Sequence, residues 1–163
     1  ETLLEQDVIE RFGEKGVSPF MLGQYVANGS VEMTSVEEED RGAVTNLAFY
    51  TDESVVYWQA PFGFDLREFD RVEFDMKVVV DPRDSGGFMM KMDCFHPCGT
   101  GDVPIEPAPV GEWKSFSFKL SDLVTHSGSS LDLTNVNTPL VIFPDWGSQK
   151  GVVMRVDKIR LLK

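Results

Sequence analysis

Five charged residues recur at alternate positions along two neighbouring segments of the chain: Glu73, Asp75, Lys77, Lys91 and Asp93. Alternation with a period of two is typical of β-strands, in which every second side chain shares a face. If the two segments pair as an antiparallel hairpin across residues 81–87, the five side chains form one polar strip. Such a strip can hydrogen-bond sugar hydroxyls. The alternative is an ordinary solvent-exposed sheet face, on which cross-strand ion pairs contribute about 0.2–1 kcal/mol each to stability.

The positions between these charges are apolar and predict the buried face of the same strands. Pro82, Gly86 and Gly87 lie in the link, where proline fixes one dihedral angle and glycine tolerates a positive φ. The alternating apolar residues are Val72, Phe74, Met76 and Val78 in the first strand and Phe88, Met90 and Met92 in the second.

Aromatic side chains are the second group that could contact a sugar, because pyranose rings have apolar faces. We predict that Trp58 lies in the core, whereas Tyr57 and Gln59 beside it share the opposite face. Trp113 shares a strand face with Ser115 and Ser117. We therefore expect it either to point outward or to cover the edge of a sheet. Trp146 lies in a turn and is the best candidate for an exposed aromatic. The aromatics able to stack are Tyr25, Tyr50, Tyr57, Trp58, Trp113 and Trp146.

The two cysteines lie four residues apart in the sequence DCFHPCG. Zinc would need more ligands than Cys94, Cys98 and His96 supply. We favour a local Cys94–Cys98 disulfide, with two free thiols as the alternative. Oxidised cysteines imply an exported protein, either secreted or located in the periplasm or at the cell surface.

A structural calcium ion is a further expectation to test. Glu10 in the first expected strand and Asp157 in the last could meet where the terminal strands pair, and carboxylate oxygens suit calcium. The alternative is that both are ordinary solvated carboxylates.

Enzymatic signatures are scarce. The sequence contains no nucleophile elbow, glycine-rich phosphate loop, HExxH motif or EF-hand loop. The two histidines lie in unrelated loops and give a Ser-His-Asp arrangement little support. We therefore predict that the chain is not an enzyme.

The whole chain predicts an all-β protein. About ten short strands are separated by turn signals every 8–12 residues, a pattern typical of a β-sandwich. Asn28-Gly29, the segment 51–53 and the segment 81–87 are expected as hairpin turns, and Ser121 as the cap of one helical turn. Residues 61–70 are expected to cap one end of the core. Without a repeat or a linker, residues 1–163 are predicted to be a single domain.

Composition narrows the possible partners. The formal charge of -12, from 27 acidic and 15 basic residues, argues against nucleic acid and anionic membranes as ligands. No apolar run approaches the ~20 residues that a transmembrane helix requires. Hydrophobic residues make up 42% of the chain, enough to fill a core.

Three segments carry a resemblance to a known family: DMKVVVDPRDSGGFMMKMDCFHPCGTGDVPI, GEWKSFSFKLSDL and MRVDKIRLL. Together they resemble the C-terminal β-sandwich appended to family 3 exo-β-glucanases of marine and Gram-negative bacteria. More distantly, VIERF, GEWKSFSFKLSDL and VDKIRLL are similar to the jelly-roll modules of carbohydrate-binding family 11 and their galactose-binding-like relatives.

These resemblances imply a jelly roll of two antiparallel sheets, a ligand on the concave outer face of one sheet, and a calcium ion near the paired termini. They place Asp75, Lys77, Lys91 and Asp93 on that concave face.

The predicted function is that of a non-catalytic carbohydrate-binding module. It would be an accessory domain tethered to the glycoside hydrolase domain of a secreted bacterial polysaccharide-degrading enzyme, and would bind β-glucan or a related algal or plant polysaccharide. The alternative is a structural β-sandwich that packs on a catalytic partner or self-associates, without a ligand of its own. The predicted sugar contacts are Asp75, Lys77, Lys91, Asp93, Tyr57, Gln59, Trp113 and Trp146.

Overall fold

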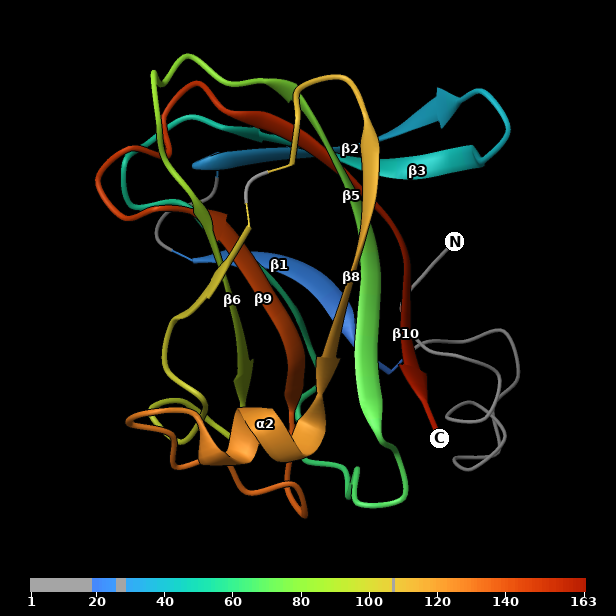
Figure 1. The fold of residues 1–163 in the computed structure, drawn as a ribbon, viewed down its shortest axis with the longest axis vertical. Helices are drawn as coiled ribbons and strands as arrows, with labels where there is room; N and C mark the ends of the chain where they lie inside the picture. Colours follow the sequence, from blue (N-terminus) through green and yellow to red (C-terminus); the bar gives the residue numbers. More distant parts are fainter. Residues whose placement is uncertain (1–18, 26–28, 107) are drawn as a thin grey trace.

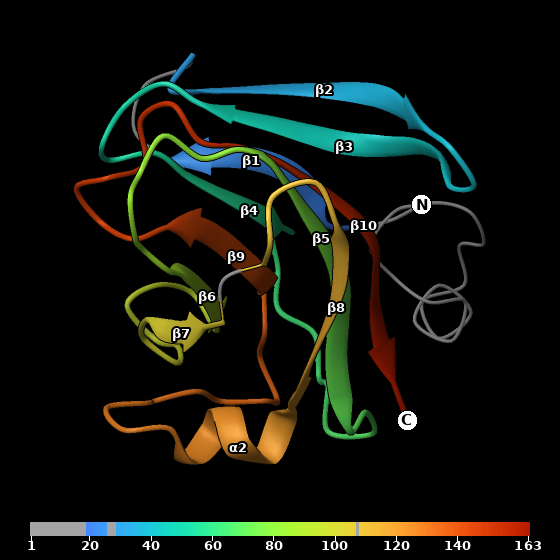
Figure 2. The ribbon, with the colours of Figure 1, turned by 45° about the horizontal axis from the view of Figure 1, so that its top comes forward.

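The computed structural model describes residues 19–25, 29–106 and 108–163, which form ten β-strands in two five-stranded sheets. Figures 1 and 2 show the sheets as two layers of a sandwich. Every pairing between neighbouring strands is antiparallel, so the predicted all-β sandwich is confirmed and is consistent with a jelly roll.

Sheet A has the strand order β1-β4-β9-β6-β7, and sheet B has the order β2-β3-β10-β5-β8. The strands of sheet A are β1 (Met21–Tyr25), β4 (Val55–Gln59), β9 (Thr138–Pro144), β6 (Phe88–Asp93) and β7 (Val103–Ile105). Those of sheet B are β2 (Val31–Glu38), β3 (Gly42–Phe49), β10 (Val153–Leu162), β5 (Arg71–Val80) and β8 (Trp113–Lys119).

The core lies between the sheets and is built from the alternating positions that the sequence predicted. Val72, Phe74 and Met76 on β5 are fully buried, as are Met90 and Met92 on β6. Trp58 on β4 is buried too, which confirms its predicted place in the core. Burying one face of each strand in this way is what makes two stacked sheets stable.

The predicted hairpin between β5 and β6 is wrong. β5 pairs with β10 and β8 in sheet B, whereas β6 pairs with β9 and β7 in sheet A. Residues 81–87 therefore cross from one sheet to the other. Arg83 holds this link in shape by bonding to Asp81 and to the Gly87 carbonyl oxygen.

Two other expected hairpins fail for the same reason. β1 and β2 lie in different sheets, and so do β3 and β4. The short turn between β2 and β3, by contrast, does join two paired strands. Strands in opposite sheets bury their apolar faces against the same core. Sequence alternation therefore fits both arrangements.

The ends of the sandwich are closed by short segments. Phe64, Leu66 and Phe69 are buried, which confirms that residues 61–70 cap the core. The helix α2 (Leu120–Thr125) lies at one end of the molecule (Figure 1). Ser121 lies within the helix and is not its cap, because the chain turns directly from β8 at Lys119 to bury Leu120. In the described part of the chain, no helix has the length and hydrophobicity needed to cross a bilayer.

Candidate functional site

A groove of ≈ 390 Å³ lies on the outer face of sheet A. Ligand sites in proteins commonly have volumes of about 300–1,000 Å³, so this groove has room for a small ligand. Its lining comes from strands β1, β4, β9 and β6 and from two loops: Tyr25, Val55, Tyr57, Gln59, Lys91, Asp93, His96, Thr138, Val141, Phe143 and Trp146.

The register of the strands explains why residues distant in sequence meet here. Val141 on the central strand β9 is paired with Tyr57 on β4 and with Lys91 on β6. These three side chains form one row across the sheet. Val141 and Phe143 face outward yet are buried, because their neighbours cover them. The floor of the groove is therefore apolar.

Tyr57 lies at one side of this row. A side chain on Gly23, its cross-strand partner, would come within 2.7 Å of the Tyr57 ring, so the ring extends over β1. The Tyr57 hydroxyl donates to the Gln24 carbonyl oxygen at 3.2 Å. Next to it, the Gln59 amide donates to the Thr138 hydroxyl at 3.0 Å.

Trp146 is an exposed aromatic of the groove, with 48% of its surface accessible. Its ring is tilted against Phe143, with the centroids 4.7 Å apart. The indole N–H donates to Asp102 Oδ2 at 2.9 Å. These two contacts position an aromatic surface that the sequence placed only in a turn, and the exposure predicted for Trp146 is confirmed.

Lys91 and Asp93 contribute the charges of the groove. Lys91 Nζ lies 3.8 Å from Asp93 Oδ1. Asp93 is 7% exposed, and Oδ1 has no hydrogen-bond partner among the residues described. Burial raises the pKa of Asp93, and this effect outweighs the opposing influence of the nearby Lys91 and His96. Ionisation of Asp93 therefore lowers the stability of the folded state.

A disulfide between Cys94 and Cys98, with an S–S distance of 2.01 Å, closes the loop beside the groove. The loop is also anchored by the Phe95 N–H, which donates to Asn137 Oδ1 at 2.7 Å. His96, within this loop, reaches the rim of the groove. The loop shape thus depends on both the covalent link and the hydrogen bond.

The structure separates the other predicted sugar contacts from this groove. Asp75, Lys77 and Trp113 lie on sheet B, so the predicted single polar strip does not exist. Its Glu73, Asp75 and Lys77 part belongs to one sheet, and its Lys91 and Asp93 part belongs to the other.

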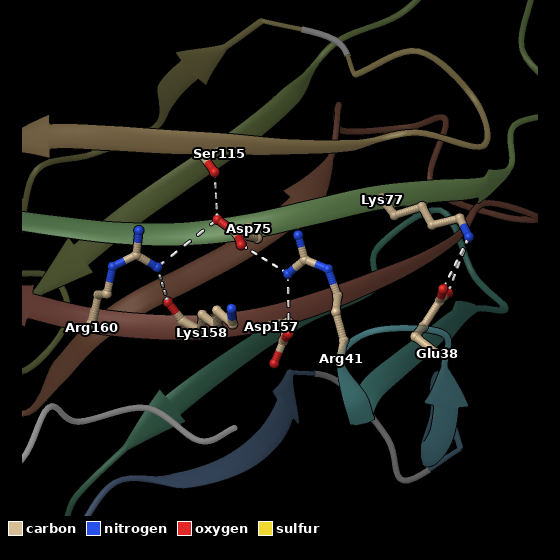
Figure 3. A network of polar contacts seen from close by, with 8 residues as sticks. All are labelled: Glu38, Arg41, Asp75, Lys77, Ser115, Asp157, Lys158 and Arg160. Carbon is tan, nitrogen blue, oxygen red and sulfur yellow. Dashed lines mark hydrogen bonds and ion pairs between the residues drawn. The ribbon is translucent and has the colours of Figure 1, made fainter.

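On sheet B, Asp75 and Lys77 each make polar contacts with other side chains of the protein (Figure 3). Asp75 accepts a hydrogen bond from Arg41 at 2.8 Å and another from the Ser115 hydroxyl at 2.7 Å. Lys77 pairs with Glu38 at 3.1 Å. Trp113 does face outward, but the Arg41 guanidinium lies 4.0 Å from its ring centroid.

The predicted calcium ligands receive no support from the described residues. Glu10 lies outside them, and Asp157 Oδ2 accepts a hydrogen bond from Arg41 at 3.1 Å. Within the ranges described, no group of three or more His, Cys, Asp or Glu side chains could hold a metal ion. The calcium ion stays a prediction.

Sequence reasoning misses several residues of the groove and of its surroundings. It identifies Tyr25 as an aromatic but does not assign it to the site, and it considers His96 only as a zinc ligand. Asp102 has no local signal at all, since its contact with Trp146 joins residues 44 positions apart. The tertiary fold alone reveals that contact.

Two antiparallel sheets with a hollow on the outer face of one define the class: a galactose-binding-like β-sandwich, the fold of many carbohydrate-binding modules. A family model described as galactose-binding domain-like, Exop_C, matches residues 14–161. The chain belongs to the Exop_C family, which confirms the resemblance noted from the sequence. No curated protein matches the chain.

Solved structures share the fold at low sequence identity. The family 11 carbohydrate-binding module from Clostridium thermocellum, in complex with a β-1,3-1,4-mixed-linked tetrasaccharide, has a TM-score of 0.59 and 20% identity, covering 91% of each chain. The extra C-terminal domain of an exo-1,3/1,4-β-glucanase from a Pseudoalteromonas species has a TM-score of 0.58 and 10% identity, covering 89% of this chain and 86% of that one.

An exo-β-agarase has a TM-score of 0.63 and 17% identity. The match covers 91% of this chain but only 24% of the agarase. The shared fold can therefore occur as one part of a much longer enzyme.

Proposed function

We propose that this chain is a non-catalytic carbohydrate-binding module and that its ligand occupies the groove on sheet A. The observation that carries this proposal is the composition of the groove. The aromatic rings of Tyr57 and Trp146 flank an apolar floor, and Lys91, Asp93 and Gln59 supply polar groups beside them. Sugars need both kinds of contact, because a pyranose ring has apolar faces and a rim of hydroxyls.

The same groove does not favour glycoside hydrolysis. Most glycosidases use two carboxyl groups that flank the scissile bond. Asp93 is the one carboxylate among the described residues that line the groove. Binding without cleavage is the simpler use of this surface.

The proposed setting is an accessory domain tethered to the glycoside hydrolase domain of a secreted bacterial enzyme that degrades β-glucan or a related algal or plant polysaccharide. The Cys94–Cys98 disulfide supports an oxidising location. The family 11 module was solved with a mixed-linked glucan fragment, and that ligand supports β-glucan as a first candidate here.

Affinity electrophoresis and calorimetry with laminarin, lichenan, xylan, agarose and alginate test the proposal. We expect at least one polysaccharide to bind with a dissociation constant between millimolar and micromolar, on the order of -4 to -8 kcal/mol. Trp146→Ala should weaken that binding by at least about two- to tenfold, since an aromatic contact contributes about 0.5–1.5 kcal/mol beyond the area it buries.

Trp113→Ala is the matched control, because it removes the same side chain from the opposite sheet. It should leave binding unchanged. Absence of binding to all five polysaccharides would refute the proposal. A stronger effect of Trp113→Ala than of Trp146→Ala would place the ligand on sheet B, and a solution dimer that covers the groove would favour the structural alternative.

A further inference from the structure

Lys91 and Asp93 are a charged pair with unused hydrogen-bonding capacity. Their side chains are 16% and 9% exposed, and the 3.8 Å between Lys91 Nζ and Asp93 Oδ1 is too long for a hydrogen bond. Asp93 Oδ1 is buried and has no hydrogen-bond partner among the described residues, and both side chains line the groove. Buried charged groups are normally satisfied, and the part of this pair that lines the groove can take an external partner.

The partner must offer a donor and an acceptor side by side. An ionised carboxylate only accepts hydrogen bonds, and an ammonium only donates them. A hydroxyl does both. Two hydroxyls on adjacent carbons of a sugar ring can therefore satisfy the pair together, one donating to Asp93 and its neighbour accepting from Lys91.

The pair also determines which charge the ligand can carry. The ammonium of Lys91 is neutralised by Asp93, so the groove has no net positive charge to offer. Asp102, which accepts the hydrogen bond of the Trp146 indole, adds another carboxylate nearby. A uronate or sulfate group would thus approach carboxylates in a protein of formal charge -12, and like charges in an interface are costly.

We propose that the groove recognises neutral glycans through two adjacent free ring hydroxyls, which bind Asp93 and Lys91. This inference rests on the proposed function and specifies its ligand. It also selects among linkages. An internal 1,4-linked glucosyl or xylosyl ring keeps its 2- and 3-hydroxyls free and adjacent, whereas an internal 1,3-linked hexosyl ring has no such pair.

Periodate provides a direct test because it cleaves the bond between two carbons that carry adjacent free hydroxyls. Binding is measured by calorimetry with lichenan and xylan, each before and after periodate oxidation and borohydride reduction. Agarose, whose backbone lacks adjacent free hydroxyls, and alginate, which has them but is anionic, complete the set. We expect binding to native lichenan or xylan, and at least tenfold weaker binding to the oxidised polymers, agarose and alginate.

Asp93→Asn tests the residue itself. It keeps the shape of the side chain, and should weaken binding about 10- to 100-fold, the range for one hydrogen bond to a charged group. Asp40→Asn is the control, because Asp40 is exposed in the turn between β2 and β3 on the other sheet. The same loss of one negative charge there should leave affinity unchanged.

The outcomes separate this inference from the proposed function. If no native polysaccharide binds, the proposed function fails. If a polysaccharide binds but periodate treatment has no effect, or agarose or alginate binds as tightly as lichenan and xylan, the groove is a sugar site and the hydroxyl-pair inference is overturned. Equal affinities for Asp93→Asn and Asp40→Asn would overturn it as well.

Discussion

Arg41 forms ion pairs with two buried carboxylates of sheet B, those of Asp75 and Asp157. Its Nη1 donates to Asp75 Oδ2 at 2.8 Å and to Asp157 Oδ2 at 3.1 Å (Figure 3). The three side chains are 19%, 7% and 0% exposed. Burial alone lowers the pKa of Arg41, but the hydrogen bonds to the two carboxylates outweigh it, and the net direction is upward. The carboxylates therefore stabilise the cation against its own burial.

Arg41→Met keeps a long apolar stem and removes the cation. Breaking a buried ion pair costs about 3–5 kcal/mol, because the remaining charge stays uncompensated. Here Arg41 is partly exposed, and Asp75 keeps the Ser115 hydroxyl at 2.7 Å, so we expect a smaller loss of about 2–3 kcal/mol. At about 2–4 °C per kcal/mol for a domain of this size, the melting temperature should fall by about 4–12 °C.

Thermal unfolding followed by calorimetry at pH 7 measures this shift, and urea unfolding at 25 °C checks its size. Arg67→Met is the matched control, since Arg67 pairs with Asp65 at 2.7 Å in an exposed position. Exposed ion pairs contribute little. Its melting temperature should equal that of the unchanged protein. If Arg41→Met also melted within 1 °C of the unchanged protein, the argument for a stabilising buried network would be refuted.

Two further predictions concern Asp93 and its neighbour Gly99. A methyl group in Gly99→Ala would overlap with Asp93 Oδ1 and lie 2.8 Å from the Met92 carbonyl oxygen, so thermal unfolding should show a loss of about 1–3 kcal/mol, and calorimetric titration a weaker affinity. Unchanged melting and binding would show that the loop adjusts freely. The pKa of Asp93 in the folded protein lies above the ordinary value of 3.8. The free energy of unfolding therefore falls as the pH rises from 3.8 through that higher pKa. Asp93→Asn should therefore melt higher than the unchanged protein at pH 7 while binding more weakly, and this gain should vanish below pH 3.8; a lower melting temperature at pH 7 would contradict the predicted cost of the charge.

Much of the fold could be predicted from local patterns. The strand positions of β5, β6, β8 and β10 follow from alternation, which depends on neighbouring residues only, and so do the buried faces of β5, β6 and β8. In β10 strict alternation fails, because an irregularity between Asp157 and Arg160 moves the core side from Met154 and Val156 to Ile159 and Leu161. The predicted burial of Trp58 and exposure of Trp146 are also correct. These features need no knowledge of which strands pair.

The candidate site was only half predictable. Tyr57, Gln59, Lys91, Asp93 and Trp146 do line one groove. The sequence assigns Asp75 and Lys77 to the same surface because it predicts that β5 and β6 pair, and it adds Trp113 as an outward aromatic; all three lie on the other sheet instead.

The sequence by itself determined which side of β5, β6 and β8 faces the core, because pleating sends alternate side chains to opposite faces and only one set is apolar. Only the tertiary structure decided which outward faces share a surface. A strand linked to its neighbour by a short segment, such as residues 81–87, can pair with it or cross to the opposite sheet, and both choices bury the same apolar side chains. Hydrogen bonding with distant strands selects between them, as when β9 joins Tyr57 and Lys91 across one groove.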